Sequence, residues 1–64
     1  MDYRTLIREK RKEKGLSQER LAKLVQVSQP FIAEIESGRK KPSVDALMRI
    51  CAVLDISLFG NGEP

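Results

Sequence analysis

The chain has 64 residues, 41% hydrophobic and 33% charged, with twelve Lys and Arg, nine Asp and Glu, one cysteine and no histidine. A chain this short forms at most one domain and buries only about 60% of the surface that its unfolded form exposes. One cysteine excludes an intrachain disulfide and a cysteine-based metal cluster, and the lack of histidine removes the usual catalytic base. We therefore expect no enzymatic activity, no metal and no cofactor.

The positive charge is concentrated toward the N-terminus. Residues 1–41 contain eleven of the twelve cations and six of the nine acids, a net charge of +5, whereas residues 42–64 have a net charge of −2. This division predicts one face for a polyanion and another for a neutral surface. There is no apolar run long enough for a signal peptide or a membrane span, so we expect a cytoplasmic protein with no membrane partner.

The first predicted helix covers residues 2–14, which are strong helix formers. Its apolar stripe consists of Tyr3, Leu6 and Ile7. One turn further on, the same face carries Arg11, so the stripe ends on a charge. Gly15 supplies the left-handed residue that closes a helix, which predicts that the helix ends at Lys14.

The second predicted helix covers residues 18–25, because the hydroxyl of Ser17 can cap its first turn. Its apolar face consists of Leu21, Ala22, Leu24 and Val25. Gln26 and Val27 form a short turn, after which Ser28 caps a third helix that ends at Gly38. Pro30 lies in the first turn of this helix, where a missing N–H has no helical partner to lose. The residues expected to face inward are Phe31, Ile32 and Ile35.

The basic loop RKKP at 39–42 precedes a fourth helix, which Ser43 caps and which runs to about Leu54. Its predicted buried face consists of Val44, Leu47, Met48, Cys51 and Leu54. Cys51 is therefore expected to be a core thiol rather than a redox sensor. Ser57 is placed to cap one more helical turn. The predicted domain covers residues 1–59 and the predicted flexible tail residues 60–64.

Two short helices joined by a tight turn, at 18–25 and 28–37, form a helix-turn-helix pattern, in which the second helix can enter a DNA major groove. The spacing alone fits a helical hairpin without a nucleic-acid role equally well. A set of short motifs decides between them: Arg11, GLSQ at 15–18, LA at 21–22, VSQ at 27–29, IxxIExG at 32–38 and KPS at 41–43.

In this order and spacing, the motifs resemble the phage repressor and Cro-type (XRE-like) helix-turn-helix family, over residues 3–59. The resemblance implies an all-α fold, a compact bundle of four to five short helices around a central helix-turn-helix, as in lambda repressor-like DNA-binding domains. It also implies a DNA-binding transcriptional regulator, usually a homodimer on a palindromic operator. The chain departs from the family at Gln26, where glycine is usual.

The resemblance implies roles for ten residues. The expected base contacts are Ser28, Gln29, Pro30 and Glu34, of which Gln29 is best suited because its amide can pair with adenine. The expected phosphate contacts are Gln18, Arg39, Lys40 and Lys41. Arg11 and Glu36 match a structural ion pair between the first and third helices. A further set, Ile56, Leu58 and Phe59, either covers the core or forms a dimer interface.

The sequence thus predicts a sequence-specific regulator that binds double-stranded DNA, a small dimeric repressor of the kind found in phages and mobile elements, restriction-modification systems and antitoxins. No small-molecule ligand is expected. The alternative is a protein-interaction module, in which the same fold binds a protein partner and contacts DNA weakly or not at all.

Overall fold

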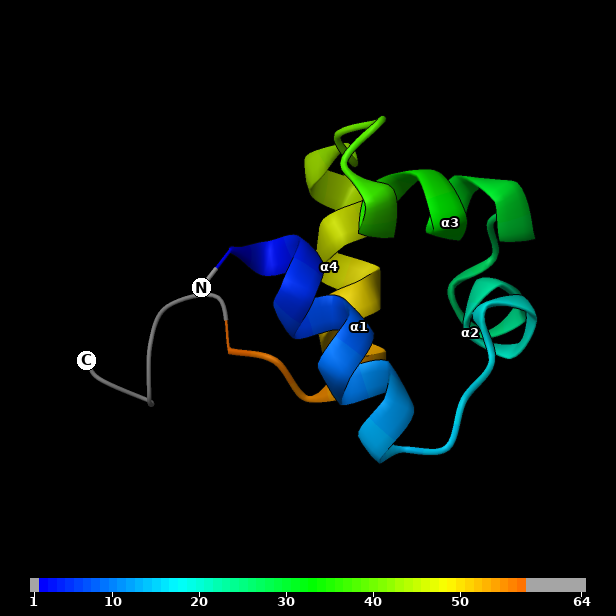
Figure 1. Cartoon of the computed structure of the whole chain (residues 1–64), viewed down its shortest axis with the longest axis vertical. Coiled ribbons are helices and arrows are strands. Elements are labelled where there is room, and N and C mark those ends of the chain that lie inside the picture. The colour runs from blue at the N-terminus through cyan, green and yellow to red at the C-terminus, as the bar shows by residue number, and fades with distance from the viewer. Residues whose placement is uncertain (1, 58–64) are drawn as a thin grey trace.

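The computed structural model describes residues 2–57 and consists of four helices (Figure 1). They are α1 (Tyr3–Glu13), α2 (Gln18–Val25), α3 (Gln29–Ser37) and α4 (Val44–Leu54). The predicted all-α bundle with a helix-turn-helix is confirmed. α1 ends one residue earlier than expected, since Lys14 is its C-cap. The extra turn assigned to Ser57 and the tail at 60–64 extend outside the described residues.

Each helix begins at a side chain that accepts a hydrogen bond from a backbone N–H of the first turn. Ser17, Ser28 and Ser43 accept from the N–H of Arg20, Phe31 and Ala46, as their positions in the sequence predict. Asp2 does the same for α1, accepting from the N–H of Thr5. These caps satisfy amides that have no partner within the helix, so the helix starts are fixed by local sequence.

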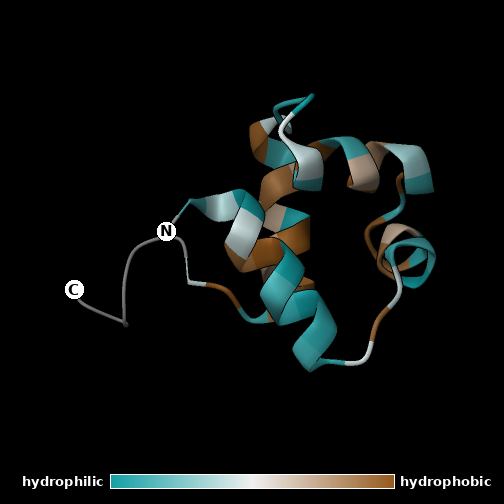
Figure 2. Cartoon of the chain, viewed as in Figure 1, coloured by the Kyte–Doolittle hydropathy of each residue, from teal (hydrophilic) through white to brown (hydrophobic). Residues whose placement is uncertain are grey.

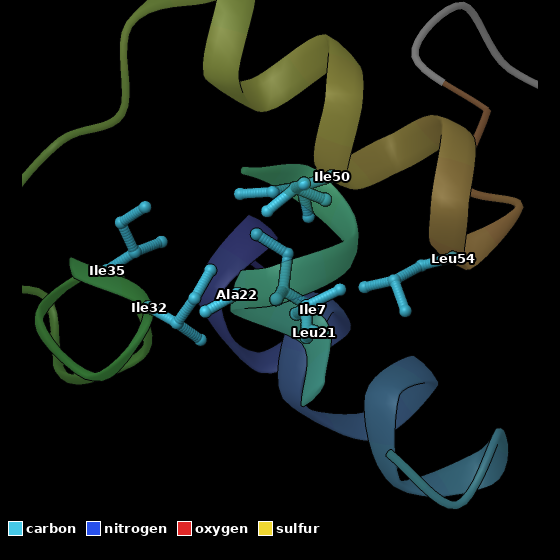
Figure 3. Packing of buried hydrophobic residues seen from close by; sticks show 8 residues of the cluster. Ile7, Leu21, Ala22, Ile32, Ile35, Ile50 and Leu54 are labelled. Atoms are coloured by element: carbon cyan, nitrogen blue, oxygen red, sulfur yellow. The ribbon is translucent and has the colours of Figure 1, made fainter. Parts of the chain in front are cut away.

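The core lies where the four helices meet (Figure 3). α1 and α2 each pack against both α3 and α4, and the bands of hydrophobic residues on the helices turn toward one another (Figure 2). The fully buried cluster consists of Ile7, Leu21, Ala22, Val25, Ile32, Ile35, Ile50 and Leu54. Cys51 is buried as predicted, and burial raises the pKa of its thiol.

Four predicted core positions are wrong, because Tyr3, Leu24, Val44 and Met48 are exposed. The error is largest on α4, where Val44 is 76% and Met48 55% exposed. The row that α4 buries contains Ala46, Ile50 and Leu54, at steps of four residues. Val44 and Met48 each precede a member of this row by two residues and so lie on the opposite side of the helix.

No helix among residues 2–57 is long and apolar enough to cross a membrane. The packing leaves α3 at one end of the bundle, beside α2 and joined to α4 by the basic loop (Figure 1). One side of α3 therefore faces the core through Ile32 and Ile35, and the other side is available to a partner.

Candidate nucleic-acid interface

The turn between α2 and α3 is fixed by backbone hydrogen bonds. Gln26 adopts the left-handed conformation, with φ 64°, and the N–H of Val27 donates to the carbonyl oxygen of Ala22 at 2.9 Å. A residue with a Cβ pays about 1 kcal/mol or more for this conformation, which is why glycine is common at such a turn. Val27 packs against the core and holds the corner in place.

The N-terminal end of α3 exposes three of the predicted base-contacting residues, Ser28, Gln29 and Pro30. The Oγ of Ser28 accepts from the N–H of Phe31 at 3.2 Å, which leaves the hydroxyl hydrogen available to donate. Pro30 has no backbone N–H and offers only its shape. Gln29 is therefore the side chain at this end whose planar amide can present an N–H and a carbonyl oxygen side by side.

The side chain of Gln29 contacts that of Gln18, from the first residue of α2. Gln29 Nε2 donates to Gln18 Oε1 at 2.8 Å, and Gln18 Nε2 donates to Glu36 Oε1 at 3.1 Å. From the sequence, Gln18 and Gln29 are predicted to contact different parts of the DNA, and no sequence pattern indicates that their side chains touch. Their contact depends on the angle between α2 and α3, which the spacing of residues along the chain does not encode.

The structure brings Arg11 and Glu36 together in an ion pair. Arg11 Nε lies 2.7 Å from Glu36 Oε2, and Arg11 Nη2 donates to Glu36 Oε1 at 3.1 Å. Arg11 Nη1 also donates to the carbonyl oxygen of Leu16 at 2.8 Å. The side chains are 10% and 3% exposed, so the pair is nearly cut off from water. A buried pair of this kind depends on complete hydrogen bonding, which these contacts provide.

The three cations of the basic loop are all exposed, but their side chains have different surroundings. Lys40 Nζ lies 3.4 Å from Glu34 Oε1 and 5.3 Å from the centroid of the Phe31 ring. Within residues 2–57, the side chains of Arg39 and Lys41 form no ion pair. The charge of Glu34 is thus partly neutralised by Lys40. This contact was not predicted, because Glu34 lies in α3 and Lys40 in the loop after it.

Gly38 fixes the start of this loop. Its φ of 86° is left-handed, and the N–H groups of Arg39 and Lys40 both donate to the carbonyl oxygen of Glu34, at 2.9 and 3.3 Å. The guanidinium of Arg4, from α1, lies so close over Gly38 that a Cβ would collide with it. Glycine is therefore favoured here by the left-handed backbone, and a larger residue would also displace the end of the Arg4 side chain.

Of the three candidate dimer residues, Ile56 is half-buried, and Leu58 and Phe59 lie outside the described residues. Ile56 lines a mainly apolar depression. The other residues around it are Asp2, Tyr3, Leu6, Ile7, Leu47, Cys51 and Ser57. Most of the surface of the depression is carbon and sulfur, and the exposed Asp2 lies among its lining residues.

The chemistry of the α3 end of the bundle is that of hydrogen bonding and charge. It combines an exposed amide, a hydroxyl, a carboxylate and three cations, which are groups able to form hydrogen bonds and ion pairs with phosphates and base edges. Among residues 2–57, no three His, Cys, Asp or Glu side chains gather as metal ligands would.

Comparison with known proteins identifies the family of this chain. Residues 7–60 match the family described as Helix-turn-helix. The chain is 51% identical over 51 residues to an uncharacterized HTH-type transcriptional regulator of Methanothermobacter thermautotrophicus, covering 80% of this chain and 74% of that protein. It is 42% identical over 53 residues to the ImmF control region 10 kDa protein of Bacillus phage phi105, covering 83% of this chain but only 59% of the phage protein.

A third relative, the HTH-type transcriptional regulator DdrOP3 of Deinococcus deserti, is 33% identical over 52 residues, which are 81% of this chain and 40% of that regulator. The matched region includes all of the α2–turn–α3 motif and the basic loop after it. Members of this family are DNA-binding regulators and not enzymes. The chain belongs to the helix-turn-helix family of DNA-binding transcriptional regulators, of the phage repressor and Cro type that its motifs resemble.

Proposed function

We propose that this protein binds a specific double-stranded DNA sequence as a homodimer and represses transcription. The observation that carries the proposal is the exposed Gln29 amide at the start of α3, which donates a hydrogen bond to Gln18, on a helix whose other end leads into the cationic loop. A helix that offers a donor and an acceptor at its N-terminal end, with cations at the other end, is suited to reading bases while the cations contact the backbone.

Gln29 is the principal base contact in this proposal, because an amide can pair with both N6 and N7 of adenine. Ser28 has a hydroxyl hydrogen to donate, and Pro30 suits a thymine methyl group. Glu34 has two possible roles: it accepts a hydrogen bond from cytosine N4, or it repels phosphates at wrong sites.

Phosphates are contacted by two groups of residues in the proposal. Gln18 combines a side-chain amide with the free N–H groups at the start of α2, and both attract an anion. The cations after α3 are Arg39, Lys40 and Lys41. If Z cations neutralise phosphates, the logarithm of the affinity falls with the logarithm of salt concentration at a slope of about −0.9Z, so titration at several salt concentrations counts these contacts.

A homodimer would place its two α3 helices in successive major grooves, with half-sites about 34 Å apart on a palindromic operator. We assign the interface to Ile56, Leu58 and Phe59, since Ile56 borders an apolar depression. The phage relative is named for a control region, which supports regulation of a phage or mobile element. In cells without a nucleus such a protein works in the cytoplasm, which is the location that we propose.

The proposal is tested by selecting bound duplexes from fragmented genomic DNA and measuring their affinities by gel shift. The expected result is one palindromic sequence, whose preference over random DNA is largely lost in Gln29→Ala. Lys41→Ala is the matched control, because loss of a phosphate contact weakens binding to all sequences alike and lowers the salt slope by about 1. Uniform binding to every duplex by the wild type would refute a specific regulator.

The alternative function, a protein-interaction module, has one observation in its favour. Val44 and Met48 expose apolar side chains on a face of α4 that the bundle does not cover. A protein partner would use such a face, whereas DNA would not. Charge reversal of Lys40 and Lys41 separates the two functions: it abolishes DNA binding in the proposed function and leaves partner binding intact in the alternative.

A further inference from the structure

The loop after α3 folds back onto the last turn of that helix. The N–H groups of Arg39 and Lys40 both donate to the carbonyl oxygen of Glu34. The side chain of Lys40 therefore lies alongside α3, with its Nζ 3.4 Å from Glu34 Oε1 and 5.3 Å from the centroid of the Phe31 ring. Phe31 and Glu34 are three residues apart, so they share one side of the helix. Lys40 thus contacts that side at two points, a carboxylate and the face of an aromatic ring.

The three cations of the basic loop are for this reason not equivalent toward DNA. Within residues 2–57, Arg39 and Lys41 form no ion pair, whereas the ammonium of Lys40 is paired with Glu34. The side chains of Lys40 and Glu34 are 49% and 42% exposed, so DNA can reach both. A phosphate that binds Lys40 has to replace Glu34 as its partner. An exposed ion pair is weak enough for such an exchange.

Whether the exchange is favourable depends on what Glu34 contacts afterwards. An ionised carboxylate only accepts hydrogen bonds, so Glu34 needs a donor in place of Lys40. Beside DNA without such a donor, the carboxylate would face the phosphates unpaired. Cytosine presents an N4 donor in the major groove, whereas guanine and thymine present acceptors at the corresponding position. A cytosine is therefore the base that can take the place of Lys40 on Glu34.

We propose that Glu34 withholds Lys40 from the phosphates until a cytosine contacts the Glu34 carboxylate. This inference rests on the proposed function, in which α3 enters the major groove of a specific operator. On random DNA, Arg39 and Lys41 contact phosphates and Lys40 stays on α3. On the operator, cytosine N4 donates to Glu34, and Lys40 becomes a further phosphate contact. Glu34 thereby makes one backbone contact conditional on the base sequence, which raises the specificity of binding.

The test measures affinities for the operator and for a random duplex at several salt concentrations. Lys40→Ala should weaken binding to the operator and reduce the magnitude of its salt slope by about 0.9, and should leave binding to the random duplex nearly unchanged. Lys41→Ala, in contrast, should reduce the slope on both duplexes. Glu34→Gln frees Lys40, so affinity for the random duplex should rise roughly two- to fivefold. Adding Lys40→Ala to that variant should then reduce both slopes alike.

Glu13→Gln is the matched control, because it also removes an exposed carboxylate that pairs with a lysine, 3.6 Å from Lys10 on α1. It reports the general effect of one negative charge fewer, and it should leave the effects of Lys40→Ala as they are in the wild type. Thermal melts establish that every variant is folded. Exchanging the cytosines of the half-site one at a time should identify one whose loss makes Lys40→Ala silent.

The inference is overturned if Lys40→Ala reduces the slope on random DNA as much as Lys41→Ala does, or reduces the slope on neither duplex. It is also overturned if Glu34→Gln raises affinity for random DNA no more than Glu13→Gln, or if no cytosine exchange silences Lys40→Ala. Each of these results leaves a specific operator in place. Equal binding of the wild type to every duplex would instead refute the proposed function, and the inference with it, so the two failures are distinguishable.

Discussion

Glu36 joins α3 to α1 through its buried ion pair with Arg11. Removing its side chain leaves the Arg11 guanidinium buried and without a counter-charge, which costs roughly 3 to 5 kcal/mol. A domain of this size has about 3 to 10 kcal/mol of total stability. We therefore expect Glu36→Ala to be largely or partly unfolded at room temperature even without denaturant. A chemical denaturation curve measures this loss.

Glu13→Ala is the control for this prediction. Glu13 is also in an ion pair, 3.6 Å from Lys10, but its side chain is 66% exposed. An exposed pair contributes between zero and about 1 kcal/mol, so this variant should unfold close to the wild-type midpoint. Equal stability of the Glu36 and Glu13 variants would show that the buried pair is not stabilising the fold.

Gln26 offers a second prediction at the residue scale, since its left-handed backbone is strained for a residue with a Cβ. Gln26→Gly should raise the free energy of unfolding by about 0.5 to 1 kcal/mol. Asp55→Gly is the comparison, because Asp55 has a similar φ of 59° but also accepts a 2.7 Å bond from Lys14. Asp55→Gly removes the strain of the left-handed backbone but also removes the ion pair with Lys14. Its free energy of unfolding should therefore increase less than that of Gln26→Gly, or not at all.

At the scale of elements, the end of α3 depends on Gly38. Gly38→Ala meets both a left-handed backbone and the Arg4 guanidinium, so we expect a loss of more than about 1 kcal/mol in a thermal or chemical melt. Gly15→Ala isolates the backbone effect, since Gly15 has a φ of 70° and nothing within 4 Å of its Cβ position. Similar losses in the two variants would mean that Arg4 simply moves aside.

The helices themselves could be predicted because their signals are local. Ser17, Ser28 and Ser43 cap amides three residues away, and Gly15 and Gly38 close the helices that precede them. α2 has the predicted bounds for this reason. Such signals need only a few neighbouring residues, so their outcome does not depend on how the helices pack.

The buried face of α4 was harder to predict, because both of its sides carry apolar residues. Val44 and Met48 follow the same spacing as true core residues, and only contact with α1 and α2 decides that Ala46 and Ile50 face inward. The link between Gln18 and Gln29 is of the same kind. Each glutamine was assigned a role on its own, and their contact arises from the crossing of α2 and α3.

The pH dependence of unfolding belongs to the whole molecule, because the two carboxyl groups of residues 2–57 with shifted pKa values cap different helices, Asp2 the start of α1 and Asp55 the end of α4. The hydrogen bond from the N–H of Thr5, together with Arg4, lowers the pKa of Asp2 to about 2. The hydrogen bond from Lys14 lowers the pKa of Asp55. Both ordinary values are 3.8, so the folded protein binds fewer protons than the unfolded chain just below that pH.

The stabilising contribution of these two carboxylates is therefore expected to be present in full above about pH 4. It should decrease as the pH falls through their pKa values in the folded protein, toward pH 2. The measurement is the melting temperature at several pH values. Asp2→Asn keeps a helix cap and Asp55→Asn keeps a residue that tolerates the left-handed backbone, and neither titrates. The double variant should have a flatter pH profile in this range. A profile as steep as that of the wild type would assign acid unfolding to other carboxylates.

The bond between Gln18 and Gln29 has a consequence for redesigning regulators of this kind. Exchanging the surface residues of α3 alone is the simplest way to transplant one protein's DNA preference into another. Here the side chain at the head of α3 is held by a residue of α2, which is held in turn by Glu36 on the buried side of α3. A graft that moves only the exposed residues into a scaffold without a glutamine at the start of α2 would leave the side chain at position 29 without this hydrogen bond. The unit to transfer is α2 with α3, together with Arg11 of α1, which pairs with Glu36.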